Sequence, residues 1–305
     1  MNRYISAMMI AAALSACGTP EVVDETTDET TEETTEETTE EEIVEEVSPD
    51  QIFGQVTALS YDPLTGELQV QIALDSGGAL QLYNADGARN GYDRYEYQEN
   101  PLNRRFTAFA GESADGGVRA VLVGDGGQFN RFYAGGQISQ VSYTAPEGGL
   151  VSYAGNYIGL LNASEDVGGL PTGTPDALGP EEAYEMSGKV FINVDFAENS
   201  LNGQIYDRLA YEATNDTLTY GVSFDDIVLV DATIGDDGRF SGSAEMEDNT
   251  AVGTFAGAFG GDGATALAGF MNLTGDFTPL LENEIENGMF ILETCTVGDP
   301  GCPGD

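Results

Sequence analysis

A glycine-rich run near the end of the chain has the spacing that dinucleotide-binding loops use. Gly261, Gly263 and Ala266 follow the pattern G-x-G-x-x-A, in which glycines let the backbone approach a pyrophosphate at the start of a helix. That chemistry needs a strand before the loop and a full crossover helix after it. Alternating segments lie on both sides here, so we predict no nucleotide partner. We interpret residues 253–273 as paired barrel strands, with a short helical turn at 264–268.

The sequence lacks the residues for several kinds of catalytic site and shows no distinctive pattern for the others. It has no histidine, which excludes Ser-His-Asp, Cys-His and histidine–metal arrangements. Thirty-eight acidic residues follow residue 50, so neighbouring carboxylates are expected by chance and identify no glycosidase-like pair. Acidic turns such as residues 236–238 cluster oxygen atoms without an EF-hand spacing, which leaves calcium as an alternative to simple turn chemistry. We predict no enzymatic activity, no cofactor and no metal.

The first residues have the character of a signal peptide. A basic start precedes an apolar run too short to span a bilayer, and the run LSACG at residues 14–18 resembles the lipobox of bacterial lipoproteins. The resemblance implies that Cys17 carries a lipid that anchors the protein to a membrane, and Gly18 after it favours the outer membrane. The alternative is ordinary secretion with Cys17 as a spare thiol.

Two cysteines and a strongly acidic run complete the evidence for an extracytoplasmic protein. Outside the cytoplasm, Cys295 and Cys302 are expected to form a disulfide. The net charge is −43, and residues 21–50 carry fifteen acids and no base. Such a run repels itself and has nothing to bury. We therefore assign residues 1–16 to the signal peptide and 17–50 to a disordered Glu/Thr-rich tether.

From residue 51 the dominant pattern is alternation of apolar and polar side chains. Val190, Ile192 and Val194 share one face of a strand. Similar segments follow at residues 217–224, 227–234, 239–246, 252–259 and 268–273, with turn residues between several of them. We predict an all-β fold: an antiparallel eight-stranded-type β-barrel at residues 150–292, preceded by a smaller strand-rich, handle-like domain at 51–149 and followed by a disulfide-closed tail at 293–305.

The two predicted domains differ in charge. Residues 51–150 carry eleven acids and six arginines, whereas residues 151–305 carry twenty-seven acids and three bases. So acidic a body repels a polyanion, and we predict no nucleic-acid partner. The arginines are expected to pair with local acids. The alternative is a ligand-binding patch, because positive charge is concentrated only here; its candidate residues are Arg89, Arg94, Arg104, Arg105 and Arg131.

Three motifs in this order resemble the β-barrels of the transferrin-binding protein B family. VDFAENSLNGQIYD (194–207) is similar to a strand-turn-strand of those barrels, and DGRFSGSAEM (237–246) resembles a later hairpin. The run GTFAGAFGGDGATALAGFMNL (253–273) resembles their glycine-rich signature. The resemblance covers about residues 151–292, behind a lipobox and an acidic tether.

This resemblance implies a non-catalytic binding module whose barrel interior is filled by side chains. Loops and outer strand faces would contact a host or environmental protein or solute, as in iron or haem acquisition, and the fold does not choose among ligands. We expect an outer-membrane protein held by its lipid on the periplasmic or cell-surface face. The alternatives are a structural envelope lipoprotein without a soluble ligand and an enzyme that uses carboxylates.

Overall fold

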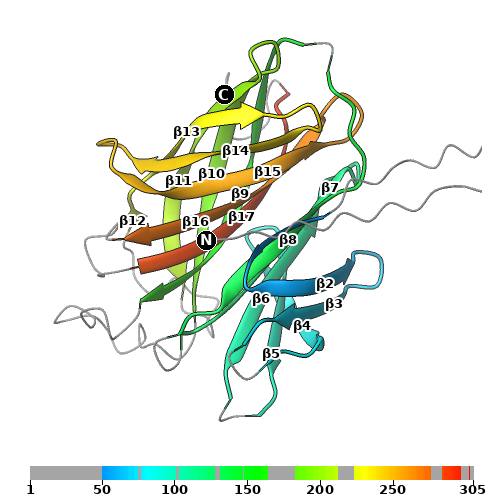
Figure 1. Ribbon diagram of the computed structural model, residues 1–305, viewed down its shortest axis with the longest axis vertical. Coiled ribbons are helices and arrows are strands. Elements are labelled where there is room, and N and C mark those ends of the chain that lie inside the picture. The colour runs from blue at the N-terminus through cyan, green and yellow to red at the C-terminus, as the bar shows by residue number, and fades with distance from the viewer. Residues whose placement is uncertain are drawn as a thin grey trace, which may run out of the picture. The chain divides into compact units, whose positions relative to one another are not determined.

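The computed structural model describes residues 50–74, 77–100, 103–127, 131–146, 148–163, 183–211, 223–275, 284–296 and 302. These residues form two antiparallel sheets (Figure 1), which confirms the predicted all-β class. Within this part of the chain, no helix is long and apolar enough to cross a membrane.

The first sheet has the strand order β1-β8-β7-β6-β5-β4-β3-β2. Its strands are β1 (Gln51–Gly54), β2 (Val56–Asp62), β3 (Glu67–Ile72), β4 (Gln81–Arg89), β5 (Tyr92–Gln98), β6 (Arg105–Glu112), β7 (Val118–Asp125) and β8 (Ala134–Gln140). The sheet curls, because β2 contacts β1 and β8 near the opposite edge. Alternation buries one face of the sheet around Leu68, Val70, Tyr95, Phe106 and Val121.

The second sheet closes into a barrel. Its strands are β9 (Leu150–Ala163), β10 (Tyr184–Asp195), β11 (Ser200–Tyr211), β12 (Ser223–Phe224), β13 (Ile227–Ile234), β14 (Arg239–Met246), β15 (Ala251–Gly260), β16 (Ala266–Gly275) and β17 (Glu284–Thr294). Each strand pairs antiparallel with its neighbours, and β10 pairs with both β9 and β11. Among the described residues, eight strands close the ring and the two-residue β12 extends β11, as the predicted eight-stranded type requires.

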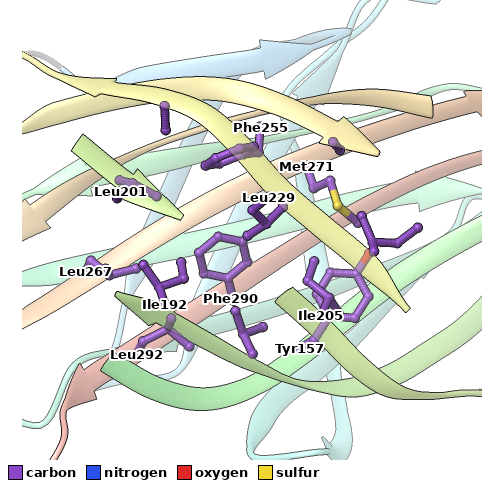
Figure 2. Close-up of a cluster of buried hydrophobic side chains, with 14 of the residues drawn as sticks. Tyr157, Ile192, Leu201, Ile205, Leu229, Phe255, Leu267, Met271, Phe290 and Leu292 are labelled. Carbon is purple, nitrogen blue, oxygen red and sulfur yellow. The ribbon is translucent and has the colours of Figure 1, made fainter. Parts of the chain in front are cut away.

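The barrel interior is filled by side chains from all eight strands of the ring. Figure 2 shows Phe255, Phe290 and Tyr157 among the residues of this cluster. Two of the large rings lie opposite a glycine: Gly242 pairs directly with Phe255, and Gly269 with Phe290. A Cβ at either glycine would overlap the ring opposite it. The glycines therefore make room for aromatic side chains in a closed volume.

The glycine-rich loop between β15 and β16 differs from its prediction. The short helical turn expected at residues 264–268 is wrong, because a tight turn leads directly into β16 at Ala266. Gly261, Gly263 and Ala264 have φ angles of 81°, 74° and 57°, which a right-handed helical turn does not allow. The Gly261 N–H donates to Ser142 O at 2.9 Å, so the loop contacts the segment that follows β8.

The first sheet packs on the outer wall of the barrel through an apolar contact. Phe109, Leu122 and Ile138 of the sheet lie against outward-facing residues of β9, β15, β16 and β17, among them Leu160 and Met289. Phe53 of β1 stacks on Phe270 of β16, with ring centroids 4.7 Å apart. The outer wall of the barrel is therefore apolar where the sheet covers it.

The pairing of glycine with phenylalanine predicts the effect of a single methyl group. Gly269→Ala should lower the free energy of unfolding by about 1–3 kcal/mol, because the ring of Phe290 must leave its place. Adding Phe290→Leu should recover part of this loss, since the smaller side chain makes room. Urea unfolding followed by far-UV circular dichroism measures both changes. Ser241→Ala on the outer wall is the control; a loss equal to that control would contradict the packing argument.

Candidate binding surface

Two of the predicted ligand-binding arginines lie in the contact between the first sheet and the barrel. Arg89 Nε donates to Glu185 Oε2 at 2.7 Å, and Arg94 Nε donates to Glu185 Oε1 at 2.6 Å. Glu185 faces outward from β10 and is fully buried by this contact. Arg94 also pairs with Asp86 and with Glu96. The two guanidinium groups thus satisfy both oxygens of one buried carboxylate.

The remaining predicted arginines lie elsewhere on the first sheet. Arg105 pairs with Glu96 at 2.5 Å, and Arg104 pairs with Asp125 and donates to the carbonyl of Arg131. Burial raises the pKa of Glu96, but the bonds from Arg105 and Arg94 outweigh it and lower that pKa overall. Arg131 is exposed. The five residues do not converge on one patch, and a ligand role for any of them stays a prediction.

Inside the barrel, the structure groups three residues that sequence reasoning did not select. Arg208 pairs with Glu286, and both side chains are fully buried. Tyr157 donates its hydroxyl proton to Glu286 Oε1 at 2.6 Å. Burial and the negative charge of Glu286 raise the pKa of Tyr157 well above its usual value, so the phenol stays protonated. Arg208 also donates to Asp225 O at 2.8 Å.

A β-bulge explains why the sequence pattern missed Arg208. Leu201 and Ile205 point inward, so strict alternation would place Arg208 outside with the other polar residues. Asp207 has a φ of 52°, and the register between β10 and β11 shifts at this point. The extra residue reverses the alternation and turns Arg208 into the interior. The sequence does carry a signal here: the polar pair Asp207–Arg208 interrupts the apolar alternation, and such an interruption could have indicated a bulge that turns Arg208 inward.

A groove of about 710 Å³ lies between the end of β1 and the outer wall of the barrel. Phe53 and Phe270 are in its lining. The wall beyond them is polar and is contributed by β13, β14, β15, β16 and β17, with Asp231, Thr233, Ser241, Thr254, Asn272 and Asn287 facing the groove. The volume is in the range typical of ligand sites, about 300–1,000 Å³. The sequence places these side chains on the outer face but does not predict that β1 lies over them.

The acidic turns raised as calcium candidates use their oxygen atoms locally. Asp237 Oδ1 accepts a hydrogen bond from Arg239 N at 3.1 Å, and Asp248 Oδ1 accepts one from Thr250 N at 2.9 Å. The bonds with Thr250 lower the pKa of Asp248. In the part of the chain that the structure describes, no three acidic or cysteine side chains are grouped as metal ligands.

The two cysteines near the end of the chain form a disulfide. Cys295, directly after β17, and Cys302 are joined with an S–S distance of 2.04 Å. The two cysteines are seven positions apart in the sequence, so the disulfide closes a short loop. Cys17 lies outside the described residues, so its lipidation stays a prediction.

Comparison with known proteins agrees with this geometry. The barrel is of the kind found in bacterial transferrin-binding proteins: residues 145–287 match the family model of the C-lobe and N-lobe β-barrels of Tf-binding protein B. The match runs from the segment before β9 into β17. The protein therefore has a transferrin-binding protein B-like fold, as the three motifs predicted. A search of the curated proteins finds no match.

Solved structures of transferrin-binding protein B are also similar. A double mutant from Haemophilus parasuis Hp5 is 12% identical with a TM-score of 0.44, over 80% of this chain and 44% of that chain. Intact Ap-TbpB, with N and C lobes, is 12% identical with a TM-score of 0.43; the match covers 80% of this chain and 46% of Ap-TbpB. The isotype 1 protein from serogroup B Neisseria meningitidis is 13% identical with a TM-score of 0.36; the match covers 77% of this chain and 51% of the Neisseria protein. The chain thus spans about half the length of these proteins.

The buried ion pair predicts a non-additive response to mutation. Glu286→Leu should lower the free energy of unfolding by about 3–5 kcal/mol, because it leaves the charge of Arg208 buried without its carboxylate. The double variant Arg208→Met with Glu286→Leu should lose much less than the sum of the two single variants. Urea unfolding at neutral pH measures all three. Additive losses would show that the two side chains do not act as a pair.

Proposed function

We propose that the protein is a non-catalytic binding module, anchored to the outer membrane by a lipid on Cys17, that holds a host or environmental protein or solute. Iron or haem acquisition is the kind of process in which we place it. The proposal rests first on the match of residues 145–287 to the barrels of transferrin-binding protein B. The identity of the ligand is not carried over, because the chain spans about half the length of the proteins it resembles.

The single observation that supports binding on the outer surface is the packed barrel interior. Phenylalanines, a buried tyrosine and the Arg208–Glu286 pair occupy the inside of the ring. A ligand would have to displace these well-packed groups, at a cost of several kcal/mol for the ion pair alone. The groove under β1 lies outside and needs no such displacement. We therefore assign the binding role to the outer wall.

The proposed anchor predicts a chemical modification. Cells that express the full chain and are grown with labelled palmitate should incorporate the label into it, and Cys17→Ser should abolish the incorporation. The paired variant Cys295→Ser with Cys302→Ser should leave the labelling unchanged, since those thiols are used in the disulfide. Label retained after Cys17→Ser, or absent from the wild-type chain, would contradict the anchor.

The proposed binding role predicts selective capture. The full chain carrying Cys17→Ser is immobilised, and proteins from host serum and from native growth medium are passed over it. A partner should be retained and should be lost with Ala256→Trp, because Ala256 lies on the wall of the groove and a bulky ring there would obstruct it. Asn193→Trp is the matched control, since Asn193 is exposed on β10 away from the groove.

Three results of this capture have different meanings. A partner retained by wild type and by Asn193→Trp, but not by Ala256→Trp, supports both the function and the groove. A partner retained equally by all three chains supports binding and removes the groove as its site. No partner from either source under any condition would reject the binding function.

A further inference from the structure

The polar wall of the groove holds two short runs of hydrogen-bonding side chains, which lie in neighbouring rows of the paired strands. Thr254 of β15 pairs directly with Asn272 of β16, which pairs directly with Asn287 of β17. Thr233 and Ser241 form a second directly opposed pair on β13 and β14. Neighbouring strands lie about 4.8 Å apart, so these groups repeat at that spacing across the wall. A ligand lying across β15, β16 and β17 would meet one polar group on each strand, whereas the row of Thr233 and Ser241 continues into Ala256 and Phe270.

Most of this hydrogen-bonding capacity has no partner within the protein. Asn272 Nδ2 donates to Asn287 Oδ1 at 2.9 Å, which leaves the Asn272 oxygen and the Asn287 amino group without a partner among the described residues. The hydroxyls of Thr233, Ser241 and Thr254 likewise bond to no other residue in the described part of the chain. The Asn287 residue is only 4% exposed, so its amide is fixed by the surrounding wall. The groove thus presents oriented donors and acceptors to a ligand.

The groove is apolar at one end and lacks positive charge. The stacked rings of Phe53 and Phe270 form the apolar end. Asp231 is the single ionisable residue among those that line the groove. The chain from residue 151 onward carries a net charge of −24, which repels an anionic ligand. Neutral amides and hydroxyls outnumber the one carboxylate, so the wall is matched to hydroxyl groups more than to a row of cations.

We propose that this groove binds a neutral oligosaccharide, free or as the glycan of a partner glycoprotein. Sugar hydroxyls both donate and accept, as the free amide and hydroxyl groups of the wall require. The C–H faces of the rings are apolar and suit the end formed by Phe53 and Phe270. This inference rests on the proposed binding function and adds to it the chemical class of ligand that the groove would bind.

The test uses the full chain with Cys17→Ser and defined sugars as probes. Isothermal titration is run with maltohexaose, chitotetraose and lacto-N-neotetraose, with sialylated lacto-N-neotetraose as the anionic probe and oligolysine as the cationic one. At least one neutral sugar should bind, and Asn272→Ala should weaken that binding about fivefold, as expected for one lost hydrogen bond. Ala256→Trp should abolish it, and Asn193→Ala, which alters an outward asparagine bonded to Ser152, should not change it.

The outcomes separate this inference from the binding function itself. Neutral sugar bound by wild type and lost with Ala256→Trp supports it, whether or not a glycoprotein carries the sugar in the cell. Capture of a partner that survives removal of its glycans, with no neutral sugar bound, overturns the inference and leaves the binding function standing. Binding of oligolysine or of the sialylated sugar in preference to every neutral one would also overturn it.

Discussion

Closure of the barrel is the constraint on which the rest of the structure depends. Because β9 pairs with both β10 and β17, none of the eight ring strands keeps an unpaired edge, and the enclosed volume is fixed. Some large rings fit because the strand opposite them carries a glycine, as at Gly269 and Phe290. The same closure removes Arg208 and Glu286 from water, so each must neutralise the other.

Because the interior is filled, the proposed binding role falls on the outer wall, on which three regions differ in character. The first sheet covers one part through apolar contacts that include Leu160 and Met289. A second part holds Glu185, which is buried by the arginines of β4 and β5. The third part is the polar wall of the groove, where Asn272 and Asn287 lie beside the end of β1. One sheet face thus changes from apolar to polar where the covering sheet ends.

Alternation in the sequence predicted the strands well, because one face of each barrel strand is buried. The expected strands at residues 227–234 and 239–246 have the bounds of β13 and β14. Alternation failed at Arg208, because the bulge at Asp207 reverses the two faces of the strand from that point on. The helical turn expected at 264–268 is wrong because Gly261, Gly263 and Ala264 have positive φ, and Gly261 bonds to Ser142, which lies far earlier in the sequence.

The candidate site was harder to predict, because it depends on contacts between residues far apart in the sequence. Arg94 and Glu185 are separated by 91 positions, and no local pattern indicates that they meet. The arginines were expected to pair with acids close in sequence, and Arg104 does pair with Asp125, whereas Arg89 and Arg94 reach the distant Glu185. The charge pattern of the sequence does not indicate the groove, since Asp231 is the single ionisable residue among those that line it.

The distribution of charge also constrains how the outer wall can recognise a ligand. Ion pairs within the first sheet and with Glu185 use much of the positive charge of the chain, and the barrel segment keeps a large negative excess. Long-range attraction therefore cannot guide an anionic ligand to the groove. A ligand held by neutral amides and hydroxyls depends on short-range hydrogen bonds, whose geometry the paired strands fix before the ligand arrives. The proposed selectivity of this wall would therefore depend on the fixed positions of its side chains in the closed ring more than on surface charge.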